Sequence, residues 1–63
     1  MKTVTCYPNA LQPGDHVITP SNVDMTLKYI DGPDHIGAYD LHGTDVNGKD
    51  QIVIVADAVK LIM

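Results

Sequence analysis

The stretch PGDHVITP, residues 13–20, decides the fold that we expect for this chain. Its Pro-Gly pair predicts a tight turn, because proline pre-sets the φ angle of the second turn position and glycine accepts a positive φ at the next one. The residues from His16 to Thr19 then read as a strand, and Pro20 ends it because proline has no backbone N–H for a ladder. We therefore expect a turn that leads directly into a short β-strand.

Strands are also predicted on both sides of this stretch. Alternating or β-forming side chains mark four segments: residues 2–7, 36–42, 51–55 and 59–62. The pair Asn47-Gly48 predicts a two-residue hairpin turn with positive φ at both residues. Gly37 falls inside an expected strand, where we expect it to relieve curvature. Residues 56–58 predict one tight helical turn before the last strand.

Residues 22–31 are compatible with either a helix or a strand. As a helix, the segment has Ser21 as its N-cap and places Val23, Leu27 and Ile30 on one face. As a strand, it alternates large side chains with polar ones, the large ones being Val23, Met25, Leu27 and Tyr29. Branching at Cβ favours the strand, but the residues leave both alternatives open.

The length of 63 residues predicts a single domain, residues 1–63, with a small core. A domain of this size buries only about 60% of the surface that its unfolded chain exposes. The one cysteine, Cys6, excludes an internal disulfide, so association with another chain is the remaining means of stabilisation. We expect an all-β domain, a small SH3-like barrel or roll of about five antiparallel strands with a core of aliphatic side chains.

The charge pattern argues against several functions. The formal net charge is −4, and the four lysines are scattered in a chain that has no arginine. Phosphate backbones are bound by clusters of basic residues, so we expect no direct nucleic-acid binding. No apolar run approaches the roughly 20 residues of a membrane span, and the first residues lack the apolar core of a secretory signal. An unpaired thiol is typical of a reducing compartment, so we expect a cytoplasmic protein without membrane contact.

Four short motifs are spread along most of the chain: a Gly-Asp-x-Val opening, a Met-Thr-Leu strand, a Gly-containing turn and a Leu-bearing last strand, at residues 14–17, 25–27, 31–32 and 59–62. In these motifs the chain resembles the YodC-like family of small bacterial proteins. The resemblance implies an SH3-like small barrel and shifts residues 22–31 further toward the strand. The family pattern has a Cys-x-Trp-Phe-like cluster where this chain has Ala-Tyr-Asp-Leu at residues 38–41, so the resemblance implies architecture and not activity.

The last dozen residues are also similar to the plasmid-type trimethoprim-resistant dihydrofolate reductases, which are tetramers of small SH3-like barrels. The similarity lies in Gln51-Ile52-Val53 and in residues 59–62. It implies that Gln51 and Ile52 line a pore shared between subunits. A tyrosine of the family pattern is replaced by Val53 and no basic residue stands near, so this enzyme is the weaker alternative.

Three histidines each follow an aspartate closely, and imidazole and carboxylate are ligands of transition metals. The pairs are Asp15-His16, Asp34-His35 and Asp40-x-His42. Turn chemistry accounts for Asp15 and Asp34, and a closed structural site normally needs four converging ligands. Cys6 is expected to be a small buried apolar residue. We therefore assign no catalytic residue, no metal ligand and no cofactor.

The run Ile-Val-Ile-Val at residues 52–55 is apolar on both faces of the expected strand. One face fills the core, and the other is covered either by the N-terminal strand or by another subunit. We therefore predict a non-enzymatic protein-interaction module that binds a partner protein or forms a homo-oligomer. Its surface is expected to include Gln51, Val53, Val55, Asp34, His35, His42 and Asp45. The aspartates of the predicted turns support an alternative, an acidic inhibitor that docks on a nucleic-acid-binding protein.

Overall fold

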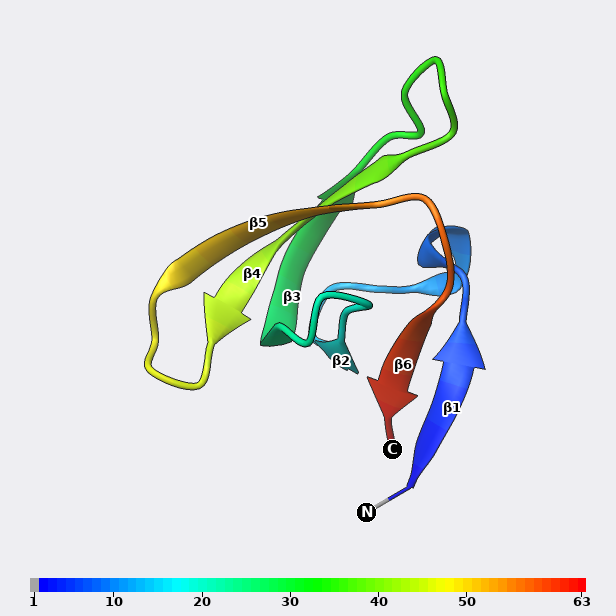
Figure 1. Cartoon of the computed structure of the whole chain (residues 1–63). Coiled ribbons are helices and arrows are strands. Elements are labelled where there is room, and N and C mark those ends of the chain that lie inside the picture. The colour runs from blue at the N-terminus through cyan, green and yellow to red at the C-terminus, as the bar shows by residue number, and fades with distance from the viewer. Residues whose placement is uncertain (1) are drawn as a thin grey trace.

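A computed structural model describes residues 2–63, and within them it contains six β-strands and no α-helix (Figure 1). The strands are β1 (Thr3–Cys6), β2 (His16–Ile18), β3 (Asp24–Asp31), β4 (Tyr39–Asp45), β5 (Asp50–Val55) and β6 (Val59–Ile62). One 3-10 turn, η1 (Pro8–Ala10), connects β1 to β2. The all-β prediction is confirmed, and the strand alternative for residues 22–31 is correct because β3 occupies most of them.

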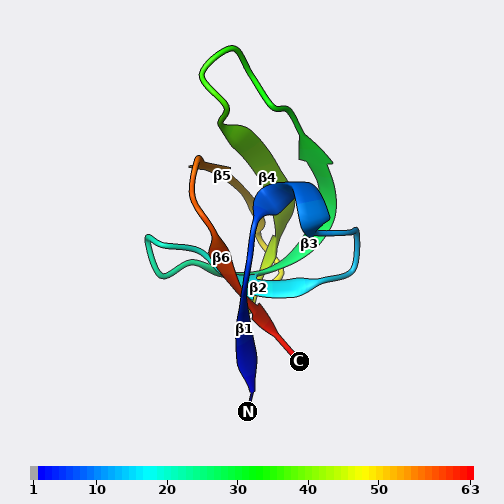
Figure 2. The same ribbon diagram turned by 90° about the vertical axis from the view of Figure 1, so that its right-hand side faces the viewer.

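The six strands form one antiparallel sheet in the order β1-β6-β2-β3-β4-β5. The sheet curls around its inner face into a small roll, as the two views of Figures 1 and 2 show. The strands β2 to β5 follow one another as a meander, and β6 returns to pair with β2. β1 adds a sixth strand beyond β6, so β1 and β5 are the two edges of the sheet.

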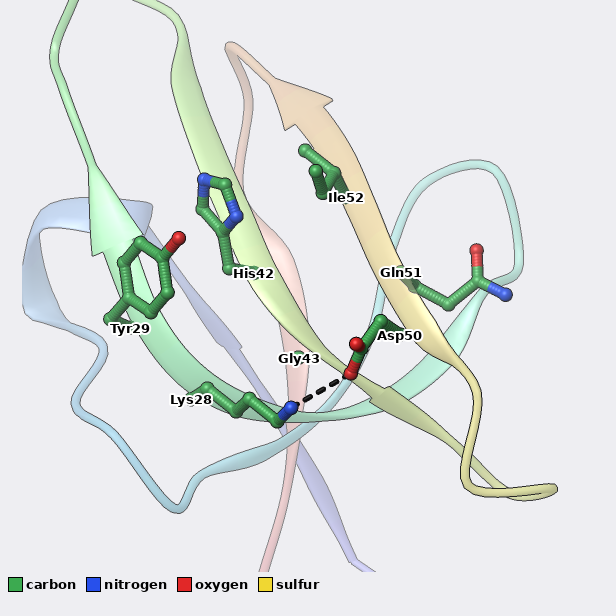
Figure 3. A pocket seen from close by; sticks show the side chains of 7 residues that line it. All are labelled: Lys28, Tyr29, His42, Gly43, Asp50, Gln51 and Ile52. Carbon is green, nitrogen blue, oxygen red and sulfur yellow. Dashed lines mark hydrogen bonds and ion pairs between the residues drawn. The ribbon is translucent and has the colours of Figure 1, made fainter.

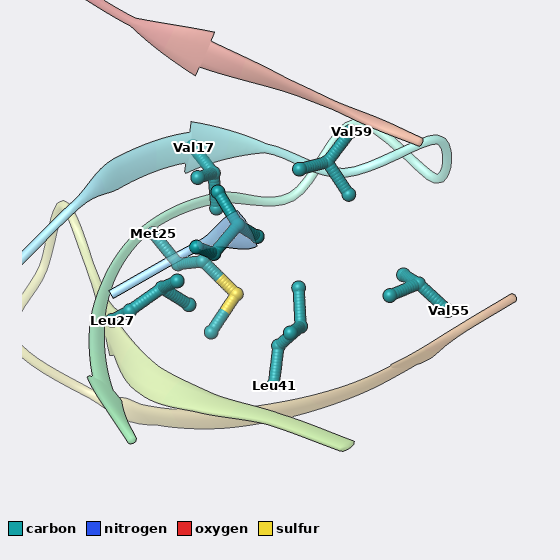
Figure 4. Close-up of a cluster of buried hydrophobic side chains, with 7 residues drawn as sticks. Val17, Met25, Leu27, Leu41, Val55 and Val59 are labelled. Carbon is teal, nitrogen blue, oxygen red and sulfur yellow. The ribbon is translucent and has the colours of Figure 1, made fainter. Parts of the chain in front are cut away.

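The core fills the inner face of the roll with aliphatic side chains from five of the strands (Figure 4). Leu41 at the middle of β4 and Val17 in β2 are completely buried. The rest of the cluster surrounds them: Leu11, Met25, Leu27, Val55 and Val59. This confirms that a chain without Phe or Trp builds its core from Val, Leu and Met, with the partly buried Tyr39 packed against it. Such a core is small, so single substitutions in it have large effects.

Three of the connections use the same five-residue turn. In each, the N–H of the first residue donates to the carbonyl oxygen of the fifth, and the carbonyl oxygen of the first residue accepts the N–H of the fourth. A side-chain oxygen of the first residue also accepts the N–H of the fifth. The three turns are Thr19–Val23, Asp34–Ala38 and Asp45–Lys49. Their fourth residues have positive φ: Asn22 at 67°, Gly37 at 84° and Gly48 at 79°. This is a type I turn followed by a left-handed residue, a common three-residue hairpin loop.

Three of the sequence predictions about turns are wrong. In the Asn47-Gly48 turn only Gly48 has positive φ, because the loop has three residues and not two. Gly37 does not relieve strand curvature, since β4 begins at Tyr39 and Gly37 closes the preceding turn. The expected helical turn at residues 56–58 is a bend, and the one helical turn within residues 2–63 is η1, where Pro8 fixes the φ angle of the first position.

A β-bulge in β3 decides which side chains reach the outer face. The register passes from Leu27 opposite Gly43 to Tyr29 opposite His42, so Lys28 is an extra residue in β3. Before the bulge Met25 and Leu27 point into the core, as the alternation predicts. After it the alternation reverses: Tyr29 is exposed, and Ile30 packs against the core instead.

Gly43 lies opposite this bulge in β4, where the backbone of β3 comes very close. A Cβ atom added at Gly43 would lie 2.1 Å from the carbonyl oxygen of Thr26 and 3.0 Å from Cε of Met25. Real Cβ atoms do not approach a backbone oxygen this closely, so only glycine fits without movement of a strand. The tight contact between β3 and β4 therefore depends on this residue.

Candidate functional site

The outer face of β5 exposes two large aliphatic side chains. Ile52 is 65% and Ile54 is 69% exposed, and Tyr29 on β3 is 49% exposed on the same face of the sheet. We call these three residues the outer strip. Of the two expected alternatives, cover by the N-terminal strand is wrong, because β1 pairs with β6 at the opposite edge of the sheet. Within residues 2–63, no other strand pairs with β5 on the side away from β4.

The free edge of β5 also carries unpaired backbone groups. Asp45 N–H donates to the Lys49 carbonyl oxygen at 2.9 Å, and the β4–β5 register continues without a break from there. Hydrogen-bonded and non-hydrogen-bonded pairs alternate in an antiparallel ladder, so Gln51, Val53 and Val55 bond to β4. The N–H and C=O groups of Ile52 and Ile54 consequently point to the free edge. An edge of this kind is a template for another strand.

A shallow cavity of about 290 Å³ lies beside the outer strip (Figure 3). The side chains of His42 and Ile52 flank it, and Gly43 is also among its lining residues. The ion pair of Lys28 Nζ with Asp50 Oδ1, at 2.7 Å, closes one end. Both of these side chains are more than half exposed, so the pair contributes little to stability and orders the rim of the cavity.

The two rings above this cavity are stacked. The centroids of Tyr29 and His42 are 4.2 Å apart and their planes differ by 11°. His42 Nε2 is buried and lies 3.2 Å from Asp31 Oδ2, but the two atoms are not aligned for a hydrogen bond. The ring of His42 on β4 packs against the ring of Tyr29 on β3, so this contact fixes the orientation of Tyr29 at one end of the outer strip.

The histidines do not pair with the aspartates that precede them in the chain. His16 contacts Asp24 across the β2–β3 pair, and His42 faces Asp31 on β3. His35 is exposed in the β3–β4 turn. No group of three His, Cys, Asp or Glu side chains that could hold a metal ion is present in residues 2–63. Cys6 is half-buried in β1 as a free thiol and packs against the edge of the core.

The residues expected at the interaction surface are divided between two ends of the sheet. Val55 is buried and Val53 is partly buried against the core, so the inner face takes both. Asp34 and His35 lie in the turn before β4, and Asp45 lies at the end of β4. The structure does bring three of the seven together: His42 and Gln51 both line the cavity, and the side-chain amide of Gln51 donates to Asp45.

Sequence reasoning missed Ile52, Ile54 and Tyr29 as the exposed members of this face. The available signal was the apolar run at residues 52–55, which showed that one face of β5 needed cover. That run does not say which of the two alternating sets faces outward. The curl of the sheet and the bulge at Lys28 decide it, and neither is visible in a local pattern.

The carboxylate of Asp45 organises the β4–β5 turn. Its Oδ1 accepts the N–H groups of Asn47 at 2.8 Å and Lys49 at 3.0 Å, and its Oδ2 accepts the side-chain amide of Gln51 at 2.9 Å. These bonds hold the pKa of Asp45 below its ordinary value of 3.8, the Lys49 N–H having the largest effect. The side chain is therefore committed to the turn in its charged form.

We expect Asp45→Asn to lower the melting temperature by a few degrees at pH 7 and to have a smaller effect in acid. The folded state depresses the pKa of this group, so its contribution to stability is present above the unfolded value of 3.8 and is lost as the pH falls through the folded pKa. Thermal melts of dilute protein from pH 7 to pH 2 measure the difference between the two chains. Asp57→Asn, in the bend after β5, is the control, and an Asp45→Asn effect that grows in acid would contradict the prediction.

Comparison with protein-family models, with curated proteins and with solved structures found no match to this chain. The resemblances to the YodC-like family and to the plasmid-type reductases therefore stay predictions. Within residues 2–63, the structure has no helix with the length and apolar character that crossing a membrane requires.

Proposed function

We propose that this protein is a non-enzymatic protein-interaction module that binds an extended segment of another chain at the free edge of β5. The observation that carries the proposal is the coincidence of unpaired backbone groups with exposed Ile52 and Ile54 on one strand. Natural proteins protect such edges with charges, proline or short strands, and residues 51–55 of this six-residue strand contain neither a charge nor a proline. An unprotected edge of this kind supports a binding role.

Strand addition accounts for both affinity and specificity at such an edge. The added segment forms main-chain hydrogen bonds with Ile52 and Ile54, and its alternate side chains contact the outer strip. Fully burying one isoleucine side chain is worth about 1.5–3 kcal/mol. The cavity beside Tyr29 and His42 gives one side chain of the added segment a place next to the strip.

The acidic alternative has less support from the positions of the carboxylates. Asp34 and Asp45 accept backbone N–H groups of their own turns, and Asp50 is paired with Lys28. A face that docks on a basic protein needs several free carboxylates together. The half-buried free thiol of Cys6 favours action in a reducing compartment, and we propose the cytoplasm.

We expect Ile54→Lys to reduce binding of the partner by about ten- to a hundredfold, because it puts a charge where the bound segment buries apolar area. The measurement is affinity capture with tagged protein from its native lysate, together with sedimentation of the purified chain, for wild type and variants. Ile36→Lys is the matched control, since Ile36 is 73% exposed but lies in the β3–β4 turn. Capture and self-association that are the same for both variants and for wild type would overturn the proposal.

A further inference from the structure

We infer that the segment bound at the β5 edge is β5 of a second copy of this chain, paired antiparallel about a two-fold axis at Val53. This inference rests on the proposed function and names its partner. An isologous pair uses the same surface on both subunits, and a sheet edge satisfies itself in this way when its residues are self-complementary. The residues around Val53 meet this condition in backbone pattern, side-chain type and charge.

The backbone pattern fits the two-fold axis at Val53. The hydrogen-bonding groups of Val53 are directed to β4, so Val53 and its copy form a non-hydrogen-bonded pair. Ile52 then lies opposite Ile54 of the second copy, and the free groups of these two residues bond to each other on both sides of the axis. All unpaired edge groups between positions 52 and 54 are satisfied.

The side chains fit the same register. Each Ile52 lies beside an Ile54 of the other chain, which joins the two outer strips into one patch of four isoleucines. At the inner face Gln51 lies opposite Val55 of the second copy. Asp50, the first residue of β5, lies nearest the small Ala56 that follows β5 of the second copy. No two like charges face each other, because Asp50 is the one charged residue in β5.

The charges next to the strand distinguish this register from its neighbours. Beyond the paired strands, the exposed Lys49 that precedes β5 lies at the same end of the pair as the exposed Asp57, in the bend after β5 of the second copy. A two-residue slip in one direction places Asp50 against the isoleucine at position 54. The slip in the other direction places the isoleucine at position 52 against Ala56, which lies beyond the end of β5. The register centred on Val53 alone gives two isoleucine pairs, and it keeps Asp50 away from the isoleucines.

Disulfide trapping tests the register directly. In a Cys6→Ala background, Val53→Cys places two thiols at a non-hydrogen-bonded position with Cα atoms about 4.5 Å apart, which a disulfide spans. Gln51→Cys is the matched control, because its own copy lies four residues along the paired strand, roughly 13 Å away. We expect mild oxidation to give at least about tenfold more covalent dimer with Val53→Cys than with Gln51→Cys. Equal yields would overturn the inference.

Sedimentation equilibrium of the unmodified chain provides the second measurement. We expect a reversible monomer–dimer equilibrium with half-dimerisation at roughly tens of micromolar, since a single strand junction is at the small end of protein interfaces. Ile54→Lys is expected to abolish it and Ile36→Lys to leave it unchanged. A chain that stays monomeric up to about 500 μM overturns the inference. If such a monomer still captures another protein through Ile54, the proposed function stands; if capture is also independent of Ile54, both fail.

Discussion

Gly43→Ala is expected to lower the melting temperature by more than about 12 °C or to leave the chain largely unfolded at 25 °C. The added Cβ would lie 2.1 Å from the Thr26 carbonyl oxygen, so β3 and β4 must separate at the bulge. The obstacle is backbone and not the end of a flexible side chain. We expect a cost of about 3 kcal/mol or more, and each kcal/mol shifts the melting temperature by about 4–8 °C in a domain of this size. Thermal and urea denaturation followed by circular dichroism measure the effect.

Gly37→Ala is the matched control for this experiment. Gly37 has positive φ but open space around it, so alanine there introduces backbone strain without a steric clash. That strain costs only about 1–2 kcal/mol. If Gly37→Ala destabilises the protein more than Gly43→Ala does, the close approach of β3 to β4 at Gly43 is not a feature of the molecule in solution.

Leu41→Ala is expected to have the second largest effect. Leu41 is completely buried at the centre of the inner face, where the core cluster from the other strands surrounds it. Replacing a buried leucine by alanine costs about 2–5 kcal/mol, and a core of fewer than 70 residues rarely supplies more than about 3–5 kcal/mol. We therefore expect most of the population to be unfolded at 37 °C, measured as loss of the cooperative thermal transition.

The control for Leu41→Ala is Ile54→Ala, which removes a similar amount of aliphatic side chain from the exposed outer strip. In dilute protein we expect it to change stability by less than about 0.5 kcal/mol, because Ile54 is 69% exposed. Comparable losses from the two variants would mean that the sheet curls toward the face that carries Ile54. The inner and outer faces described above would then be exchanged.

The sequence was sufficient to predict the elements in which local chemistry and tertiary packing agree. The turn before β2 forms as the Pro13-Gly14 pair predicts, with Gly14 at a φ of 95° and a hydrogen bond from Asp15 N–H to Gln12. The alternation of Met25 and Leu27 correctly marks the inner face of β3. The aliphatic composition also predicted the kind of core that the roll contains.

The features that sequence analysis missed depend on contacts between strands. Tyr29 continues the alternation of β3 in the sequence, but the extra residue Lys28 turns it outward. Gly43 looks like any strand glycine until β3 is placed against it. Asp45 is expected at the interaction surface, whereas its carboxylate accepts two N–H groups of its own turn. For the candidate site, sequence marked β5 but not which of its faces is exposed.

The repeated five-residue turn has a consequence for the order in which the chain gains structure. Each such turn joins neighbours in the meander and closes a very short loop, so the entropy lost on closure is small. The pairing of β2 with β6 instead joins Val17 to Leu61, which lie far apart in the sequence. Non-local contacts of this kind slow folding, because much of the chain must be ordered before they form. The cooperativity of the whole domain therefore rests on the return of its last strand.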